Sequence, residues 1–235
     1  MTNTKFSNRW AGRVSQLGWL VAIIIVLVIV ADQWLKIWIK THFYLGEEME
    51  IFPWFRLKFI ENNGFAFGLE WFNKYVLTFG RILAVVFFIW AMRRLLDLSS
   101  NGGIFNLMKE SDGKEKRSPV NLPLGFYIAF ALIIAGAAGN IFDCVFYGEI
   151  FNNPAPPETA VMFPQSGGYA GWFEGRVVDM LYFPLFSFDI GNSHFEFFEY
   201  IFNIADSAIT IGVLMLLLFY RDASSAAMMS LFEKK

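Results

Sequence analysis

The stretch that decides the fold is VSQLGWLVAIIIVLVIVA, residues Val14–Ala31, an uncharged run of 18 residues. A helix of about 20 mostly apolar residues crosses the hydrocarbon core of a bilayer, which is about 30 Å thick. The run passes directly into ADQWLKIWIK (31–40) without the small-residue site at which a signal peptide is cleaved. We therefore expect it to form a permanent membrane span.

Three further segments have the same character. Tyr75–Met92 is apolar except for Arg81, and Tyr200–Tyr220 is apolar except for Asp206. The longest uncharged run, with 25 residues, is Ser118–Phe142. The sequence thus predicts an all-α membrane protein, one integral domain over 1–235, with four transmembrane helices at about 14–36, 75–94, 120–143 and 200–220.

The composition supports this class and excludes several others. Of the 235 residues, 56% are hydrophobic and only 17% are charged, which is too few charges for a soluble globule. A net charge of −2 argues against a nucleic-acid partner. The single cysteine, Cys144, excludes an intrachain disulfide, and neither histidine has a second histidine at ligand spacing. No metal is therefore expected.

The orientation follows from the basic residues, which concentrate in loops on the cytoplasmic side. Lys and Arg cluster in the N-terminal tail, in the loop 97–117 and its flanks, and at the C-terminal end. Residues 145–199 carry one basic residue, Arg176, against seven carboxylates. We expect both termini and the loop 97–117 to be cytoplasmic, and 41–74 and 145–199 to face outward.

The loops are expected to differ in structure. FRLKFI (Phe55–Ile60) alternates apolar and basic residues, which predicts a half-buried strand. NNPAPPET (Asn152–Thr159) and QSGG (Gln165–Gly168) are typical of irregular turns, and an aromatic segment following Asp179 suits the headgroup region. The cytoplasmic loop is polar and is expected to be mobile.

Polar residues at membrane depth are expensive, so they normally line a cavity or a site. Three pairs at helical spacing lie near the outer ends of spans: Asp32 with Lys36, Asn140 with Asp143, and Asn203 with Asp206. Each pair has a purely structural alternative, as a local ion pair or a helix cap. Asp179 alone would be a solvated loop acid, and Arg81 either snorkels outward or faces a polar cavity.

Carboxylates are the chemical groups that remain, because the chain has no HExxH, GxSxG, Ser–Lys or Walker A pattern. Two carboxylates held close in a low-dielectric site share one proton, so one can activate water while the other polarises a carbonyl. Asp179 and Asp206 are the best candidates, although a separation of 27 residues does not show that they meet. A proton-coupled transporter and a scaffold subunit remain alternatives.

Five motifs, in this order, resemble those of the lipoprotein signal peptidase (signal peptidase II) family of bacterial aspartic peptidases. They are ADQWLK (31–36), ENNGFAFG (61–68), GAAGNIFD (136–143), VVDM (177–180) and FNIADSAI (202–209). Together with four spans and two inner termini, they cover nearly the whole chain.

The resemblance implies a peptidase of the bacterial inner membrane that is open toward the periplasm. Such a peptidase cleaves prolipoproteins before a cysteine that bears a diacylglyceryl group, uses no metal or organic cofactor, contacts membrane lipids and is inhibited by globomycin. The resemblance also implies a small periplasmic β-sheet cradle, a helix or loop over the site, and a monomer. Asp179 and Asp206 would be catalytic, with substrate-binding or supporting roles for Asp32, Lys36, Asn62, Gly64, Asn140, Asp143 and Asn203.

The chain departs from the family pattern in two places. Cys144 stands where the family usually has an arginine, so we expect Lys36, Arg81 or Arg176 to supply the basic contact. The 36 positions from Asp143 to Asp179 are more than usual, and the Pro- and Gly-rich insert is expected to lie outside the membrane near the entrance of the site.

Overall fold

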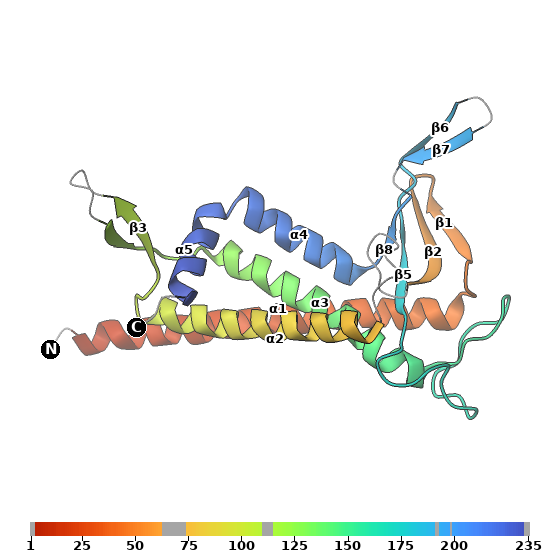
Figure 1. The fold of residues 1–235 in the computed structure, drawn as a ribbon, viewed down its shortest axis with the longest axis horizontal. Coiled ribbons are helices and arrows are strands. Elements are labelled where there is room, and N and C mark those ends of the chain that lie inside the picture. The colour runs from red at the N-terminus through yellow and green to blue at the C-terminus, as the bar shows by residue number, and fades with distance from the viewer. Residues whose placement is uncertain (1–2, 63–73, 110–114, 191–192, 198, 233–235) are drawn as a thin grey trace. The chain divides into compact units, whose positions relative to one another are not determined.

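The computed structural model describes residues 3–62, 74–109, 115–190, 193–197 and 199–232. Its five helices are drawn in Figure 1, and their bounds are α1 Asn3–His42, α2 Lys74–Ser100, α3 Leu124–Ile150, α4 Ile204–Leu218 and α5 Arg221–Phe232. Three segments are long and apolar enough to cross a membrane: Gln16–His42, Tyr75–Ser100 and Leu124–Ile150. The first three predicted spans are thereby confirmed as helices, each extending beyond the predicted end.

The fourth predicted span, 200–220, is partly wrong. Its helix α4 has only 15 residues, because Ile201–Phe202 forms a short strand, β8, and Asn203 precedes the first helical turn. After Leu218 the chain turns by 94° into α5. The fourth span is therefore either this bent pair or a short helix, since 15 residues extend only about 22 Å.

The chain divides into two compact units. One unit consists of residues 1–27, 84–135 and 208–235. Its core is built on Phe126, Tyr127 and Phe130 of α3, against which Leu95 of α2 and Ala226 of α5 are buried. Most of the residues that α5 buries in this core are small, such as Ala223 and Ala227, which allows the helix to pack closely against it.

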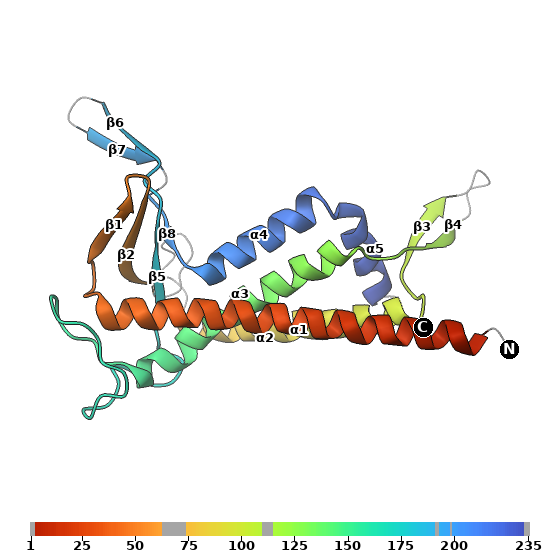
Figure 2. The ribbon, with the colours of Figure 1, turned by 180° about the vertical axis from the view of Figure 1, so that it is seen from behind.

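The other unit, residues 28–83 and 136–207, contains a four-stranded antiparallel sheet with the strand order β1-β2-β5-β8. Figure 2 shows these strands side by side. Their bounds are β1 Glu48–Phe52, β2 Phe55–Asn62, β5 Val177–Tyr182 and β8 Ile201–Phe202. The predicted strand FRLKFI and the small β-sheet are thus confirmed. A second core packs Phe59, Val178 and Met180 of the sheet against Ile39 and Tyr147 of the helices.

Two hairpins were not anticipated. Strands β3 (Phe105–Lys109) and β4 (Glu115–Pro119) pair within the loop that was expected to be mobile. Strands β6 (Phe186–Ile190) and β7 (Ser193–Phe197) occupy most of the aromatic segment. None of the five described helices corresponds to an extramembrane helix over the site, and residues 63–73 lie outside the described part of the chain.

The insert is largely irregular, as predicted, but it is also anchored. Phe151 forms an isolated bridge with Met162, and both pack against the second core. The Tyr169 hydroxyl accepts a hydrogen bond of 2.7 Å from the backbone N–H of Arg176. The insert is therefore folded onto the end of α3 rather than detached from it.

Candidate active site

The buried ammonium of Lys36 organises one side of the site. Its Nζ lies 2.8 Å from Asp32 Oδ2 and 2.8 Å from Asp143 Oδ2, and it donates a 2.8 Å hydrogen bond to Asn140 Oδ1. An ammonium has three N–H donors, and all three are engaged here. The structure therefore brings together four residues that the sequence placed in two separate helical pairs.

Asp32 also holds the start of α4. Its Oδ1 accepts a 2.8 Å hydrogen bond from the backbone N–H of Ala205, in the first turn of α4. A carboxylate is favourable there because the first N–H groups of a helix lack intrahelical partners and the helix dipole is positive at that end. The approach is close: a Cβ added to Gly139 would lie 2.8 Å from Asp32 Oδ2. The small residues before Asn140 thus allow α1, α3 and α4 to meet at this point.

Asp143 links α3 to the sheet. Its Oδ2 accepts a 3.3 Å hydrogen bond from the backbone N–H of Val178, and its Oδ1 accepts a 2.8 Å bond from Gln33 Nε2. The Gln33 Oε1 in turn accepts a hydrogen bond of 3.0 Å from the Tyr147 hydroxyl. Because Val178 directly precedes Asp179, this bond fixes the strand that carries the next carboxylate.

Asp179 lies in the middle of β5, opposite Ile60 of β2, with a side chain that is only 1% exposed. Its Oδ1 accepts a 2.6 Å hydrogen bond from Asn203 Nδ2, and its Oδ2 accepts a longer bond, 3.3 Å, from Asn62 Nδ2. Burial, with a further contribution from the negative charge of Asp206, raises the pKa of Asp179 to about 7. This carboxyl group can therefore hold a proton at neutral pH.

Asp206 is half-buried in the first turn of α4. Asn203 caps this helix: its Oδ1 accepts a 2.8 Å bond from the Asp206 N–H, and Asp206 Oδ2 accepts a 3.4 Å bond from the Asn203 N–H. This is the reciprocal pattern of a capping box. Asn140 Nδ2 donates a 2.7 Å hydrogen bond to Asp206 Oδ1. Asn203 thus contacts both carboxylates: its side-chain Nδ2 donates to Asp179, and its backbone N–H donates to Asp206.

Eight of the nine residues singled out from the sequence therefore join one hydrogen-bonded group, and the ninth, Gly64, lies outside the described residues. Two of the structural alternatives are also correct, since Asn203 caps a helix and Asp32 pairs with Lys36. The third is wrong: Asn140 and Asp143 do not cap a helix end, because α3 continues to Ile150. Within the described ranges, no group of three or more His, Cys, Asp or Glu side chains is arranged to hold a metal ion.

Sequence reasoning missed a second buried ion network beside this site. The Glu61 carboxylate contacts Lys40 Nζ through Oε1 and lies 2.9 Å from Arg176 Nη1 through Oε2. Lys40 Nζ also lies over the rings of Phe59 and Tyr169, at 5.6 and 5.3 Å from their centroids. Two signals were available, because Lys40 is one turn after Lys36 and Glu61 begins the motif ENNGFAFG.

The three candidates for the missing basic contact have different surroundings. Lys36 is enclosed by acceptors, and Arg176 is bound to Glu61. Arg81 contacts the cysteine: its Nη1 lies 3.5 Å from Cys144 Sγ. Arg81 therefore faces a polar neighbour inside the protein rather than only snorkelling outward, and Cys144 itself is buried.

Three comparisons with known proteins agree with one another. The family model described as signal peptidase (SPase) II matches residues 24–109 and 116–221. The chain is 41% identical over 210 residues to a lipoprotein signal peptidase of Porphyromonas gingivalis, covering 86% of this chain and 83% of that one. A lipoprotein signal peptidase of Amoebophilus asiaticus is 31% identical, covering 83% and 75% of the two chains. The fold is similar to a solved bacterial membrane enzyme, with a TM-score of 0.52 and 23% identity over 85% of this chain and 90% of that one.

Proposed function

The chain belongs to the signal peptidase II family, and we propose that the hydrogen-bonded group around Asp179 and Asp206 is the site at which it cleaves its substrates. As a member of this family, it is a multi-pass bacterial membrane protein and an aspartic peptidase that processes prolipoproteins. The observation that carries the site assignment is that Asn203, in the motif FNIADSAI, donates hydrogen bonds to the carboxylates of both Asp179 and Asp206.

The two acids have environments suited to different roles. Asp179 is almost fully buried and its pKa is raised to about 7, so it holds the shared proton. Asp206 is half-buried in the first turn of α4, so water reaches it more easily than it reaches Asp179. We assign Asp206 as the base that water can reach and Asp179 as the acid that hydrogen-bonds to the scissile carbonyl oxygen.

Hydrolysis of the peptide bond uses these two carboxyl groups and one water molecule. Asp206 takes a proton from water as the water oxygen bonds to the carbonyl carbon, and the Asp179 proton moves toward the carbonyl oxygen. The tetrahedral intermediate collapses as the C–N bond breaks: the proton held on Asp206 passes to the leaving amine, and the proton on the former carbonyl oxygen returns to Asp179. The new carboxyl group then ionises in water. The products are a signal peptide with a new carboxylate and a lipoprotein with a free amino-terminal cysteine.

The remaining predicted residues support this pair. Asn203 and Asn62 donate hydrogen bonds to Asp179, and Asn140 donates one to Asp206. Lys36 offsets one of the two negative charges that Asp32 and Asp143 place beside the dyad. Gly64 is proposed to contact substrate.

The substrate class is tested by processing of two precursors. Purified protein should convert a prolipoprotein that carries a diacylglyceryl group on its cysteine to a faster-migrating form on a gel. The same precursor without the lipid should remain uncut, because binding energy from the acyl chains contributes to positioning the scissile bond. Equal cleavage of both precursors would contradict a lipid-dependent peptidase.

The membrane orientation is a proposal as well: both termini and the β3–β4 hairpin are cytoplasmic, and β5 and the insert are periplasmic in the inner membrane. In a variant with Cys144→Ala, a membrane-impermeant thiol reagent should label Ser166→Cys on intact cells. It should label Asn101→Cys only after the membrane is opened. The opposite labelling pattern would refute this orientation.

Arg81 is proposed to supply the cationic contact at Cys144. A thiol carries no positive charge and is a weak donor, so it cannot replace an arginine's fixed donors. Arg81→Gln should lower kcat/KM by about 10- to 150-fold, as expected for a charged hydrogen bond worth about 1.5–3 kcal/mol. Cys144→Ser should retain most activity, and Arg56→Gln, at a surface ion pair with Glu48, is the matched control. An inactive but folded Cys144→Ser protein would show that the thiol itself is required.

Two further expectations follow from the family. Globomycin-type cyclic peptides should compete with substrate at this site, and prolipoprotein cleavage measured against inhibitor concentration tests this. The chain should act as a monomer, and light scattering of the purified protein should give the mass of one chain. The mass of two chains would disprove this.

A further inference from the structure

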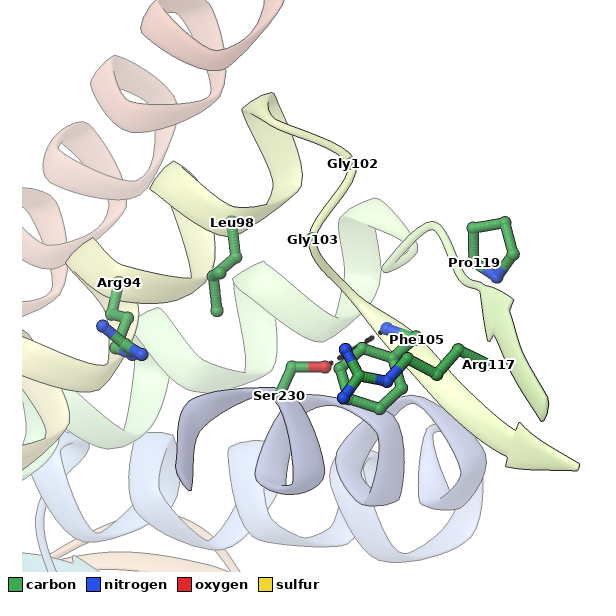
Figure 3. Close-up of a pocket in the computed structure, with 8 residues that line it drawn as sticks. All are labelled: Arg94, Leu98, Gly102, Gly103, Phe105, Arg117, Pro119 and Ser230. Carbon is green, nitrogen blue, oxygen red and sulfur yellow. Dashed lines mark hydrogen bonds between the residues drawn. The ribbon is translucent and has the colours of Figure 1, made fainter. Parts of the chain in front are cut away.

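A cavity lies in the unit formed by residues 1–27, 84–135 and 208–235. It has a volume of about 360 Å³ and lies where the end of α2, the β3–β4 hairpin and α5 meet (Figure 3). Arg94, Leu98, Phe105, Arg117 and Ser230 are among the residues that line it. A volume in this range is typical of sites that hold small molecules or parts of larger ones.

The lining is strongly basic. Arg94 and Arg117 enter it from different elements, and none of the described lining residues carries a carboxylate. The Nε–H of Arg94 donates a 3.2 Å hydrogen bond to the backbone oxygen of Leu231, which orients a guanidinium that has four other N–H donors. The guanidinium of Arg117 lies 4.8 Å from the centroid of the Phe105 ring. Both cations are thus positioned by neighbours within this unit.

Two positioned guanidinium groups around a cavity suit an anion with several oxygen acceptors. Arginine binds phosphate through paired N–H donors, and these charge-assisted bonds are about twice as strong as neutral ones. Ser230 adds a hydroxyl group, which accepts a 3.2 Å hydrogen bond from the Phe105 N–H and donates one of 2.7 Å to the Ala226 carbonyl. The serine thereby ties the hairpin to α5 and fixes the wall of the cavity.

The position of the cavity along α2, relative to the membrane boundary, indicates where the phosphate comes from. Trp90 is 44% exposed, and its ring lies 6.4 Å from that of Phe232, which is 61% exposed. Trp is enriched at the boundary between hydrocarbon and headgroups. Arg94 follows Trp90 by one helical turn, about 6 Å along the axis, which is the level of the lipid phosphates. We propose that this cavity binds the phosphate of an anionic phospholipid headgroup between Arg94 and Arg117.

The test measures lipid binding rather than peptidase activity. The full chain, purified in neutral detergent, is titrated with phosphatidylglycerol and separately with phosphatidylcholine, and bound lipid is counted by native mass spectrometry. Arg117→Gln should weaken phosphatidylglycerol binding about fivefold, since a basic residue near anionic lipid contributes about 1 kcal/mol. Arg94→Gln should have an effect of similar size, but it also removes the bond to Leu231. Arg117→Gln therefore keeps the test valid if Arg94→Gln fails to fold.

The matched control is Arg93→Gln, which removes an exposed charge next to Arg94 but outside the cavity lining. It should leave phosphatidylglycerol binding unchanged, and all three variants should still cleave prolipoprotein in detergent. Equal losses in Arg93→Gln and Arg117→Gln would overturn the proposal, because general surface charge would then explain the binding. A competition arm uses inorganic phosphate. If inorganic phosphate bound to the wild-type protein but not to Arg117→Gln, while phosphatidylglycerol binding was the same in both proteins, the cavity would be a site for free phosphate. That result would overturn the lipid assignment.

Discussion

Replacing either acid of the pair, Asp179→Asn or Asp206→Asn, should reduce the turnover of prolipoprotein about 10³-fold or more while the protein stays folded and inserted in the membrane. An amide cannot accept a proton from water or hand one to a carbonyl oxygen, and each acid–base function contributes about 10²–10⁴ to the rate. The shapes are nearly equal, so packing is retained. At most one hydrogen bond is lost at each site, such as that from Asn203 to Asp179.

The matched control for these variants is Asp97→Asn, which makes the same change at an exposed position on α2 and should leave turnover unchanged. Turnover is measured on a diacylglyceryl-modified prolipoprotein, with thermal unfolding followed on the same samples. A folded Asp206→Asn protein with near wild-type turnover would show that Asp206 is not the base.

The second large effect concerns stability. Lys36→Met should destabilise the protein by about 3–5 kcal/mol, because it leaves Asp32 and Asp143 buried without their shared cation. Both carboxylates are almost inaccessible to water, so neither can be solvated in place. The expected result is a lower unfolding temperature or a failure to accumulate folded protein.

Lys58→Met is the control for this stability effect, since Lys58 pairs with Glu48 at 3.1 Å on the surface of the sheet. An exposed ion pair contributes about 0–1 kcal/mol, so this variant should unfold near the wild-type temperature. Adding Asp32→Asn and Asp143→Asn to Lys36→Met should recover part of the lost stability, because the buried charges are then removed together. If Lys36→Met unfolded at the wild-type temperature, the buried network would not be a stabilising element.

Much of this site could be predicted from residue spacing, because helical neighbours are local in sequence. The pairing of Asp32 with Lys36 and the cap formed by Asn203 both follow from the helical repeat. The meeting of Asp179 with Asp206 could not be predicted in this way. It depends on the register that places Asp179 opposite Ile60 and on the side chain of Asn203, which are long-range features.

The errors in the fold have similar physical causes. The run 200–220 is apolar enough for a span despite Asp206, so hydropathy does not reveal that Ile201 and Phe202 pair with β5 before the helix begins. Strand β4, with the sequence EKRSP, lacks the alternation of apolar residues by which a strand is recognised. Its partner β3 supplies the backbone hydrogen bonds, and such pairing is not visible within either segment alone.

The most direct test of the central claim, that Asp179 and Asp206 share one catalytic proton, is the dependence of kcat/KM on pH for the wild-type protein. Since burial raises the pKa of Asp179 to about 7, the singly protonated pair is present below that pH and is lost as the pH rises through it. We therefore expect kcat/KM to fall about tenfold per pH unit above about 7, once Asp179 has lost its proton. A rate that instead continued to rise from pH 7 to about 9, as for a base that must lose its proton at alkaline pH, would contradict the account.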